Sequence, residues 1–365
     1  MIEKKNYPGM FDLFKGYAMV VILFAHTHGA VPVNVMMGEN PTVPVRIFFA
    51  FERILSLFQG MMPLFFMISG YGFSPASMKK CIKKQTRVLL KPYLLTTLFV
   101  TIVHFFSQCV ATANLKESVL RAAQVCLSYL LGISQRTAFH GIQFSFIGSV
   151  WFLLTLYFSW ILLNAINLYV QERFRPLAVL MLALAGYLWG NRGVIPFCLP
   201  QALIGVGYMY VGQQLKKNDW LFKKIPIPAW CVIVLFAGIS IFFGEIDMAY
   251  RIWKLGLLDI IGGGCSAFLL ARGSLLLNKY ENKILDTLRS IGLYSLWIMC
   301  IHSVESVGLL WRRYASRYYD HPFIAFFAVF ILRSCIVYCL YRIVKKCSWS
   351  LRKRKRRLKQ IARQG

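Results

Sequence analysis

The stretch FDLFKGYAMVVILFAHTHG, residues 11–29, decides the fold because it joins an apolar run of membrane-spanning length to ionisable residues. Asp12 and Lys15 precede the run, and His26 lies well inside it. An α-helix turns about 100° per residue, so the eleven steps from Lys15 to His26 make roughly three turns plus ~20°. We therefore expect Lys15 and His26 on one face, with Asp12 about 40° away and His28 on the far side. The rise of roughly 16 Å between Lys15 and His26 is about half the hydrocarbon thickness.

The composition predicts a multi-pass membrane protein. The chain has 365 residues, 58% of them hydrophobic, and a formal net charge of +28. Soluble chains are about 45–50% apolar, and here the excess falls in blocks close to the length that crosses a bilayer. Basic residues flank these blocks, as in cytoplasmic loops beside anionic lipid, so we expect membrane lipid and not nucleic acid as a partner. The ten cysteines form no C-x-x-C pair, so we expect no disulfide framework and no metal site.

The distribution of charge sets the expected topology. Eleven apolar blocks lie near residues 10–30, 46–74, 87–108, 119–134, 150–170, 176–190, 198–214, 229–244, 252–271, 288–310 and 322–344. If 119–134 does not cross, 29 of the 42 basic residues fall on the inner side and 9 on the outer side. This asymmetry predicts ten spans with both termini cytoplasmic, and 119–134 as an amphipathic helix that is interfacial or re-entrant on the outer face.

The predicted fold class is therefore all-α, a polytopic bundle of about ten transmembrane helices in the cytoplasmic (cell) membrane. We expect one transmembrane domain over residues 1–345 and a basic cytoplasmic tail over 346–365. The chain has no P-loop, dinucleotide fingerprint, H-E-x-x-H or G-x-S-x-G motif, so the common soluble-enzyme chemistries are not indicated.

Several residues of the first half have both a structural and a functional interpretation. Lys15 suits a snorkelling anchor, and His26 suits a neutral imidazole bonded to another helix, but a cation and a base on one face can address one ligand. Ser69 and Gly70 allow close approach of either a helix or a ligand. Arg87 lies in a basic loop that serves topology or binds phosphates.

The second half adds three further groups. Trp151 begins a span, where an aromatic-belt anchor is the usual role. His302 and Glu305 lie three residues apart and form a second polar cluster towards the outer half of their span. Asp259 and Arg333 are interpreted as an ion pair between helices.

The ordered set of motifs resembles the membrane acyltransferase family 3, bacterial integral-membrane O-acyltransferases. The resemblance covers nearly the whole chain and rests on FDLFKGYAMVVILFAH, MPLFFMISGY, KKQTRVLLKPYL, VWFLLTLYFSW, LIGVGYMYVGQQL and IGLYSLWIMCIH. The family's first span carries Arg, ten residues and then His; here Lys15 replaces the Arg, and the D-x-x-K-G form resembles the sugar O-acetyltransferase branch. Lys is a point charge, so bidentate phosphate recognition is weakened while the cation remains.

The resemblance implies an acyl-CoA donor, with acetyl-CoA favoured, and a hydroxyl acceptor on a cell-surface glycan or glycolipid. No bound cofactor is expected. His26 would be the general base, and Lys15, with Arg87, would hold donor phosphates or offset charge on the thioester oxygen. Asp12 would orient Lys15.

The remaining candidates are assigned to the two substrates. Ser69 and Gly70 would line the donor passage, and Trp151, His302 and Glu305 are the acceptor-side candidates.

Two other classes of function remain open from the sequence. An exporter or flippase of lipid-linked polysaccharide intermediates would also use ten spans and buried ionisable residues, although no paired inverted halves are evident. A purely structural or regulatory membrane partner would leave His26 without a purpose. An acylated product favours the enzyme, and the oligomeric state, including a homo-oligomer, is left open.

Overall fold

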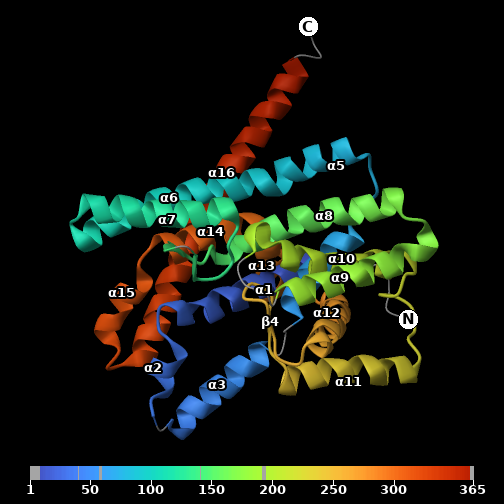
Figure 1. The fold of residues 1–365 in the computed structure, drawn as a ribbon, viewed down its shortest axis with the longest axis horizontal. Coiled ribbons are helices and arrows are strands. Elements are labelled where there is room, and N and C mark those ends of the chain that lie inside the picture. Colours follow the sequence, from blue (N-terminus) through green and yellow to red (C-terminus); the bar gives the residue numbers. More distant parts are fainter. Residues whose placement is uncertain (1–8, 40, 57–59, 140, 191–194, 362–365) are drawn as a thin grey trace.

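The computed structural model describes residues 9–39, 41–56, 60–139, 141–190 and 195–361. It is a helical bundle with two short antiparallel hairpins (Figure 1). The first half contains α1 (Met10–Ala25), η2 (His26–Gly29), α2 (Val33–Met37), α3 (Val43–Ser56), α4 (Met61–Tyr71), α5 (Met78–Gln85), η3 (Thr86–Leu90), α6 (Lys91–Thr112), α7 (Leu115–Leu131), β1 (Thr137–Phe139), β2 (Ile142–Phe144), η4 (Gly148–Val150), α8 (Trp151–Tyr169), η5 (Glu172–Phe174) and α9 (Arg175–Gly190). The second half contains η6 (Pro196–Cys198), α10 (Leu199–Lys217), α11 (Ile227–Phe243), β3 (Ile246–Asp247), β4 (Ile252–Trp253), α12 (Leu257–Leu277), α13 (Lys283–Leu293), α14 (Ser295–Gly308), α15 (Trp311–Ala315), η7 (Ser316–Tyr318) and α16 (Pro322–Ile361).

The predicted multi-pass helical architecture is confirmed at the level of helix type and apolar character. Within the described ranges, five helical stretches are long and apolar enough to cross a membrane: Met10–Gly29, Met78–Thr112, Gly148–Tyr169, Leu257–Leu277 and Pro322–Lys346. The pair α13 and α14 makes a sixth if it counts as one span, although it bends by 76°. The helices α4 and α11 are apolar but shorter. The expected single span over 288–310 is therefore a pair of helices with a sharp bend between them and not one straight helix.

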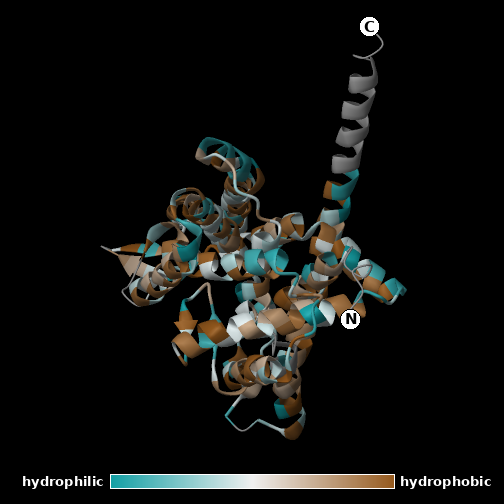
Figure 2. Ribbon diagram, turned by 90° about the vertical axis from the view of Figure 1, so that its right-hand side faces the viewer, coloured by the Kyte–Doolittle hydropathy of each residue, from teal (hydrophilic) through white to brown (hydrophobic). Residues whose placement is uncertain are grey.

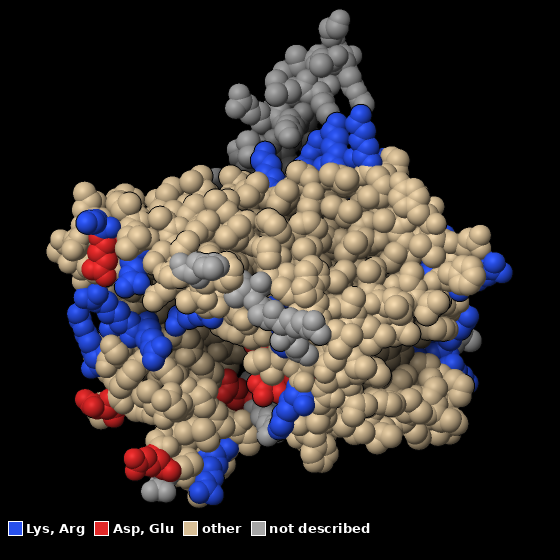
Figure 3. Space-filling model, viewed as in Figure 1, with Lys and Arg blue, Asp and Glu red and all other residues tan. Residues whose placement is uncertain are grey.

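Basic side chains are concentrated at the two ends of the bundle and at the base of the last helix. Figure 3 shows Lys and Arg at the left and right ends of the view and below the last helix, with further charged side chains in the lower part of the view. Figure 1 places α15 and the α6–α7 turn at the left end, and the α8–α9 and α10–α11 connections at the right end. Figure 2 shows the last helix changing from hydrophobic to hydrophilic where it leaves the bundle. The basic side chains at the left and right ends thus lie where helices of the bundle are connected.

The amphipathic helix predicted over 119–134 corresponds to α7 (Leu115–Leu131), which begins and ends with ordinary capping signals. The Asn114 side chain accepts a hydrogen bond from the Glu117 N–H at 3.1 Å, which satisfies one orphan donor at the start of α7. Gly132, at φ 61°, ends the helix in the left-handed conformation that glycine adopts at low cost. α7 runs beside α6 in the ribbon (Figure 1), and it is not among the helices long and apolar enough to span.

Small residues bring α1 close to α13, and α4 close to α10. A Cβ on Gly16 would lie 1.8 Å from the Leu288 carbonyl oxygen, and one on Gly292 would lie 1.8 Å from that of Asp12. Gly70 is equally tight against the backbone of Met209 in α10. The Gly16 and Gly292 contacts fix α1, which carries Lys15 and leads into His26, against α13, and the Gly70 contact fixes α4 against α10.

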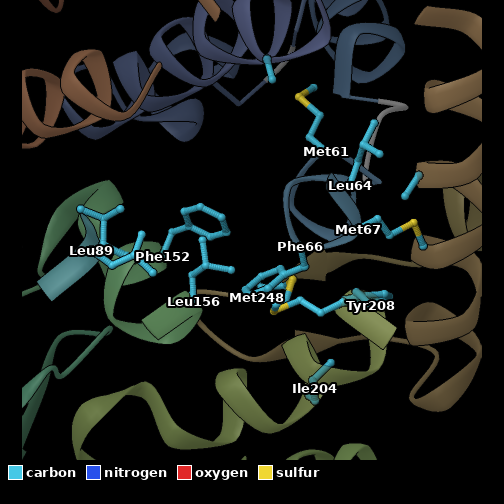
Figure 4. Packing of buried hydrophobic residues seen from close by; sticks show 14 of the residues in the cluster. Met61, Leu64, Phe66, Met67, Leu89, Phe152, Leu156, Ile204, Tyr208 and Met248 are labelled. Atoms are coloured by element: carbon cyan, nitrogen blue, oxygen red, sulfur yellow. The ribbon is translucent and has the colours of Figure 1, made fainter. Parts of the chain in front are cut away.

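The apolar core is formed mainly by α4, α8 and α10. Figure 4 shows Phe66 of α4, Tyr208 of α10 and Met248 gathered at one point, with Phe152 and Leu156 of α8 beside Leu89 at another. Phe66 is fully buried. The second group borders a cavity that reaches the end of α1.

Candidate functional site

The first part of the site is the face of α1 that the sequence predicts. Lys15 and His26 line the same cavity, of about 430 Å³. Asp12 lies 2.7 Å from the Lys15 ammonium, so the expected contact between them is present. α1 ends at Ala25, and His26 opens the 3₁₀ turn η2. The imidazole thus lies where the helix gives way to tighter turns.

This first cavity is mainly apolar, and we call it the Lys15 cavity. Trp151, Phe152 and Leu156 line it from α8, and Phe65 and Ser69 line it from α4. Trp151 is only 5% exposed, so the ring faces the interior and not a lipid interface. The Ser69 hydroxyl donates to the Phe65 carbonyl at 3.0 Å. The lining suits a largely apolar part of a ligand that carries a few polar groups.

A second cavity, of about 810 Å³, lies on the other side of His26 and is richer in polar residues. We call it the arginine cavity, because Arg136, Arg312 and Arg313 are among its lining residues. Four residues line both cavities: His26, Phe146, Asp247 and Tyr250. His26 is therefore accessible from two chemically different compartments.

The boundary between the cavities contains an aromatic pair and a carboxyl group. The rings of Phe146 and Tyr250 stack with centroids 5.4 Å apart and planes 16° from parallel. The Asp247 carboxylate accepts a hydrogen bond from the Tyr250 backbone N–H at 3.0 Å. Burial raises the pKa of Asp247, and the backbone N–H groups of Tyr250 and Ala249 oppose that rise. The β3–β4 hairpin thus brings a carboxyl and an aromatic ring to the histidine.

His26 heads a chain of buried ionisable groups. Its Nδ1 lies 2.8 Å from Nε2 of His302, and Nδ1 of His302 lies 2.7 Å from a carboxylate oxygen of Glu305. His302 is 1% exposed and Glu305 is 2% exposed. The sequence predicted His302 and Glu305 as a separate polar cluster, which is wrong: both belong to the His26 network.

Arg333 of α16 closes the network into a ring. Its guanidinium donates to both carboxylate oxygens of Glu305 at 3.0–3.1 Å, and to the His26 carbonyl at 2.8 Å. The Trp311 indole N–H also donates to Glu305, at 2.8 Å. This charge-assisted set holds Glu305 as an ionised carboxylate aimed at His302.

The interpretation of Asp259 and Arg333 as an ion pair is wrong. The Asp259 carboxylate instead accepts from the Ser240 hydroxyl at 2.9 Å and from the Leu255 N–H at 2.8 Å. Asp259 therefore ties α12 to the end of α11 and to the β4 loop. Arg333 is paired with Glu305, 28 residues earlier in the chain.

The hydrogen-bond partners of His26 and His302 determine which of their ring nitrogens carry protons. An ionised Glu305 only accepts, so His302 presents N–H at Nδ1 and a lone pair at Nε2. That lone pair accepts from Nδ1–H of His26, which leaves the lone pair of a neutral His26 on Nε2. In the part of the chain that the structure describes, no protein group bonds to this nitrogen. His26 is thus prepared to take a proton from a ligand.

The other predicted residues have different surroundings. His28 does not line either cavity, and its Nε2 lies 2.6 Å from the Glu52 carboxylate, which ties η2 to α3. Gly70 also does not line the Lys15 cavity, and its tight contact with α10 gives it a packing role. Arg87 is exposed in the π-helical turn η3 and does not line the cavity, whereas its neighbour Leu89 does.

Sequence reasoning missed the role of Arg333 and the contributions of Phe146, Asp247, Tyr250 and Trp311. For Arg333 a signal existed, because an arginine within an apolar span is costly unless it is paired. Nothing in the spacing of Phe146 and Tyr250 predicted their contact. Within the described ranges, no group of three or more His, Cys, Asp or Glu side chains could hold a metal ion.

Comparison with known proteins adds one positive finding. A family model described as an acyltransferase domain matches residues 10–342 of the chain. The match includes the whole His26 network, from α1 to Arg333 in α16. No curated protein and no protein of solved structure matches the chain.

Proposed function

This chain belongs to the membrane acyltransferase family 3, and from that premise we propose that it transfers an acetyl group from acetyl-CoA to a glycan hydroxyl. The acceptor is a cell-surface glycan or glycolipid, and His26 is the general base. One observation carries the proposal: the lone pair on Nε2 of His26 is available where two unlike cavities meet.

The reaction is a direct acyl transfer. Nε2 of His26 takes the proton from the acceptor hydroxyl as its oxygen forms a bond to the thioester carbon. The C–S bond breaks, and the proton on His26 passes to the departing CoA sulfur, so that an O-ester and a free thiol result. His302 and Glu305 do not touch the reacting atoms in this scheme. They position His26 and stabilise the imidazolium that forms between the two proton transfers.

The Lys15 cavity suits the donor. Its apolar walls accommodate the linear arm of acyl-CoA, and a sugar ring would find few polar partners there. Lys15 supplies a cation for donor phosphate or for charge that develops on the thioester oxygen. Asp12 restrains the ammonium at 2.7 Å, and Ser69 lines the same cavity. Trp151, predicted as an acceptor-side residue, also lines this cavity, so we reassign it to the donor side. Arg87 is exposed two residues before Leu89, which lines this cavity, and is a candidate for binding a donor phosphate.

We further propose ten spans with both termini cytoplasmic, in the cytoplasmic membrane, with the basic tail at 346–365 on the same side as Lys15. The gathering of the α8–α9 and α10–α11 connections at one end and of α15 at the other supports this topology (Figure 1). Cysteine labelling from each side at Lys116 and Arg136 tests it, and both positions should react from outside. Reaction from the cytoplasm alone at either position would contradict the topology.

The activity is tested on membranes that contain the full-length protein. With [¹⁴C]acetyl-CoA and glycolipid extracted from the same cells, we expect base-labile label in the glycan, lost in His26→Gln. A flippase would leave the glycan unlabelled and would instead change how much glycolipid reaches the outer leaflet. The product therefore separates the two readings that the sequence left open.

A further inference from the structure

We infer that the acceptor carries a negatively charged group, a phosphate or a carboxylate, close to the hydroxyl that is acylated. Arg136, Arg312 and Arg313, at the mouth of the arginine cavity, would bind this group. The inference rests on the proposed function and adds the substrate class of the cavity on the far side of His26. Its basis is the excess of positive charge at the mouth of the arginine cavity.

All three arginines line the cavity, and all three are exposed. Among the described residues, no carboxylate lies within ion-pair distance of any of them. Arg313 donates to the Ala111 carbonyl at 2.6 Å, a neutral partner that leaves its charge uncompensated. By contrast, the fourth lining arginine, Arg333, is fully engaged with Glu305. The cavity mouth therefore has an excess of positive charge.

The negative groups in the same cavity do not cancel this excess. Asp247 is the one acidic residue among the residues that line the cavity, and it lies at the boundary with the Lys15 cavity. Its carboxylate accepts from the backbone N–H of Tyr250, which satisfies part of its charge locally. Three uncompensated cations against one carboxylate favour an anion at the outer part of the cavity.

Membrane topology does not account for these arginines. With ten spans, all three lie in outer loops, where only 9 of the 42 basic residues are found. The positive-inside bias disfavours Lys and Arg on that side. That three of the nine converge on one cavity from separate segments therefore calls for a ligand. Figure 3 shows the basic side chains over α15 beside a hollow in the surface, on the side of the molecule where Figure 1 places α15.

The rest of the lining suits a sugar. Tyr250, Phe146 and Trp311 offer aromatic faces, and Gln108, Ser145 and Ser306 offer neutral hydrogen-bonding groups. A ring held by these groups would place a hydroxyl near His26, and a charged substituent would project towards the arginines. Guanidinium groups bind phosphate and carboxylate through paired N–H donors, which makes three arginines more selective than a general positive field.

The test compares matched variants in cells that make the full-length protein. Arg136→Gln/Arg312→Gln removes two charges and leaves the Arg313 bond to Ala111 intact. The control is Arg317→Gln, an exposed arginine of η7 that does not line the cavity. Envelope glycans are separated by anion exchange into acidic and neutral fractions, and base-labile acetate is measured in each. Each exposed contact of this kind is worth about three- to tenfold, so we expect acetate in the acidic fraction to fall about 10- to 100-fold in the double variant, which loses two. Arg317→Gln should leave it unchanged.

The same samples identify the anion. Cold aqueous hydrofluoric acid cleaves phosphate esters and would move a phosphate-bearing product into the neutral fraction, whereas a uronic carboxylate would stay in the acidic one. His26-dependent acetate in the neutral fraction alone would overturn the inference and leave the proposed acyltransferase standing, as would equal losses in the double variant and in Arg317→Gln. Absence of His26-dependent acetate from both fractions would overturn the proposed function and the inference together.

Discussion

Replacement of Glu305 by glutamine removes one charge from the centre of the His26 network and should reverse the protonation of both histidines. Arg333 donates only, so it would hold the glutamine oxygen and turn the amide NH₂ towards His302. Nδ1 of His302 would then accept, and its Nε2–H would donate to Nδ1 of His26. The remaining proton of a neutral His26 would reside on Nε2, the nitrogen that must act as base.

The expected magnitude follows from the loss of a general base, typically about 10²–10⁴ in rate, or about 3–5 kcal/mol of transition-state stabilisation. In the Ser-His-Asp triad, the corresponding Asp-to-Asn change, which also imposes the wrong tautomer, costs about 10⁴. Here the carboxylate is separated from the base by one more imidazole. We therefore expect kcat to fall by about 10²–10⁴, with the KM for acetyl-CoA nearly unchanged because the Lys15 cavity is untouched.

A second effect must be separated from the first. Glu305→Gln leaves the buried Arg333 without a counter-ion, and an unpaired buried charge costs about 3–5 kcal/mol of folding stability. The double variant Glu305→Gln/Arg333→Gln removes that charge and should recover much of the folded yield. It should not recover transfer, because the carboxylate that orders the histidines is still missing.

The assay is acetyl transfer from [¹⁴C]acetyl-CoA to extracted glycolipid. Rates are normalised to the amount of folded protein, which is judged from the thermal unfolding transition in detergent. Glu305→Asp, which keeps the charge but shortens the side chain, should retain more activity than Glu305→Gln. If Glu305→Gln folds and transfers acetyl within about threefold of the parent rate, the relay does not set the His26 tautomer.

Three further changes test the donor side, the base and the packing. Lys15→Ala should lose most of the transfer activity and Lys15→Arg should retain much of it, because the proposal requires a cation. Both are measured on matched amounts of membrane protein. An active Lys15→Ala variant would reduce Lys15 to a topology anchor. His26→Gln should lower the rate about 10²–10⁴-fold in the same assay. His28→Gln can still hydrogen-bond to Glu52 and should lose far less. Equal losses would show that the effect comes from damage to η2 and not from loss of a base. Gly292→Ala should lower the melting temperature, since its Cβ would meet a backbone oxygen of α1 and overpacking costs about 1–3 kcal/mol. Gly273→Ala, with no atom within 4 Å of its new Cβ, is the control, and equal stability of the two would refute the close approach.

Much of the fold could be predicted from local sequence. Apolar runs and their flanking signals predict most of the helices, since both depend on neighbours a few residues apart. The common lining of one cavity by Lys15 and His26 was predictable for the same reason, because α1 carries Lys15 and continues directly into η2, which begins at His26. The break at Tyr294 was missed, since an apolar run gives no sign of a bend of 76° between α13 and α14.

The His26 network could not be predicted in this way because it depends on helix packing. His26 and His302 are 276 residues apart, and Arg333 bonds to the His26 carbonyl across 307 residues. No periodicity within one helix determines which face of another it will meet. Trp151 illustrates the same limit, since a tryptophan at the start of a span suits an interface equally well until α8 is packed with that face inward.

The contrast between the two cavities bears on the choice between an enzyme and a flippase. A flippase moves one substrate, and its two ends would need to accept the same polar head group. Here one cavity is apolar and of about 430 Å³, whereas the other is polar, basic and of about 810 Å³. The two cavities meet at His26. Its partner His302 is hydrogen-bonded to the buried carboxylate of Glu305, and this order leaves the lone pair of His26 on Nε2. Buried ionisable chains also serve transporters, so the network alone does not discriminate. The separation of two unlike cavities is the feature that suits a reaction between two different substrates. The geometry therefore favours transfer between two ligands over passage of one.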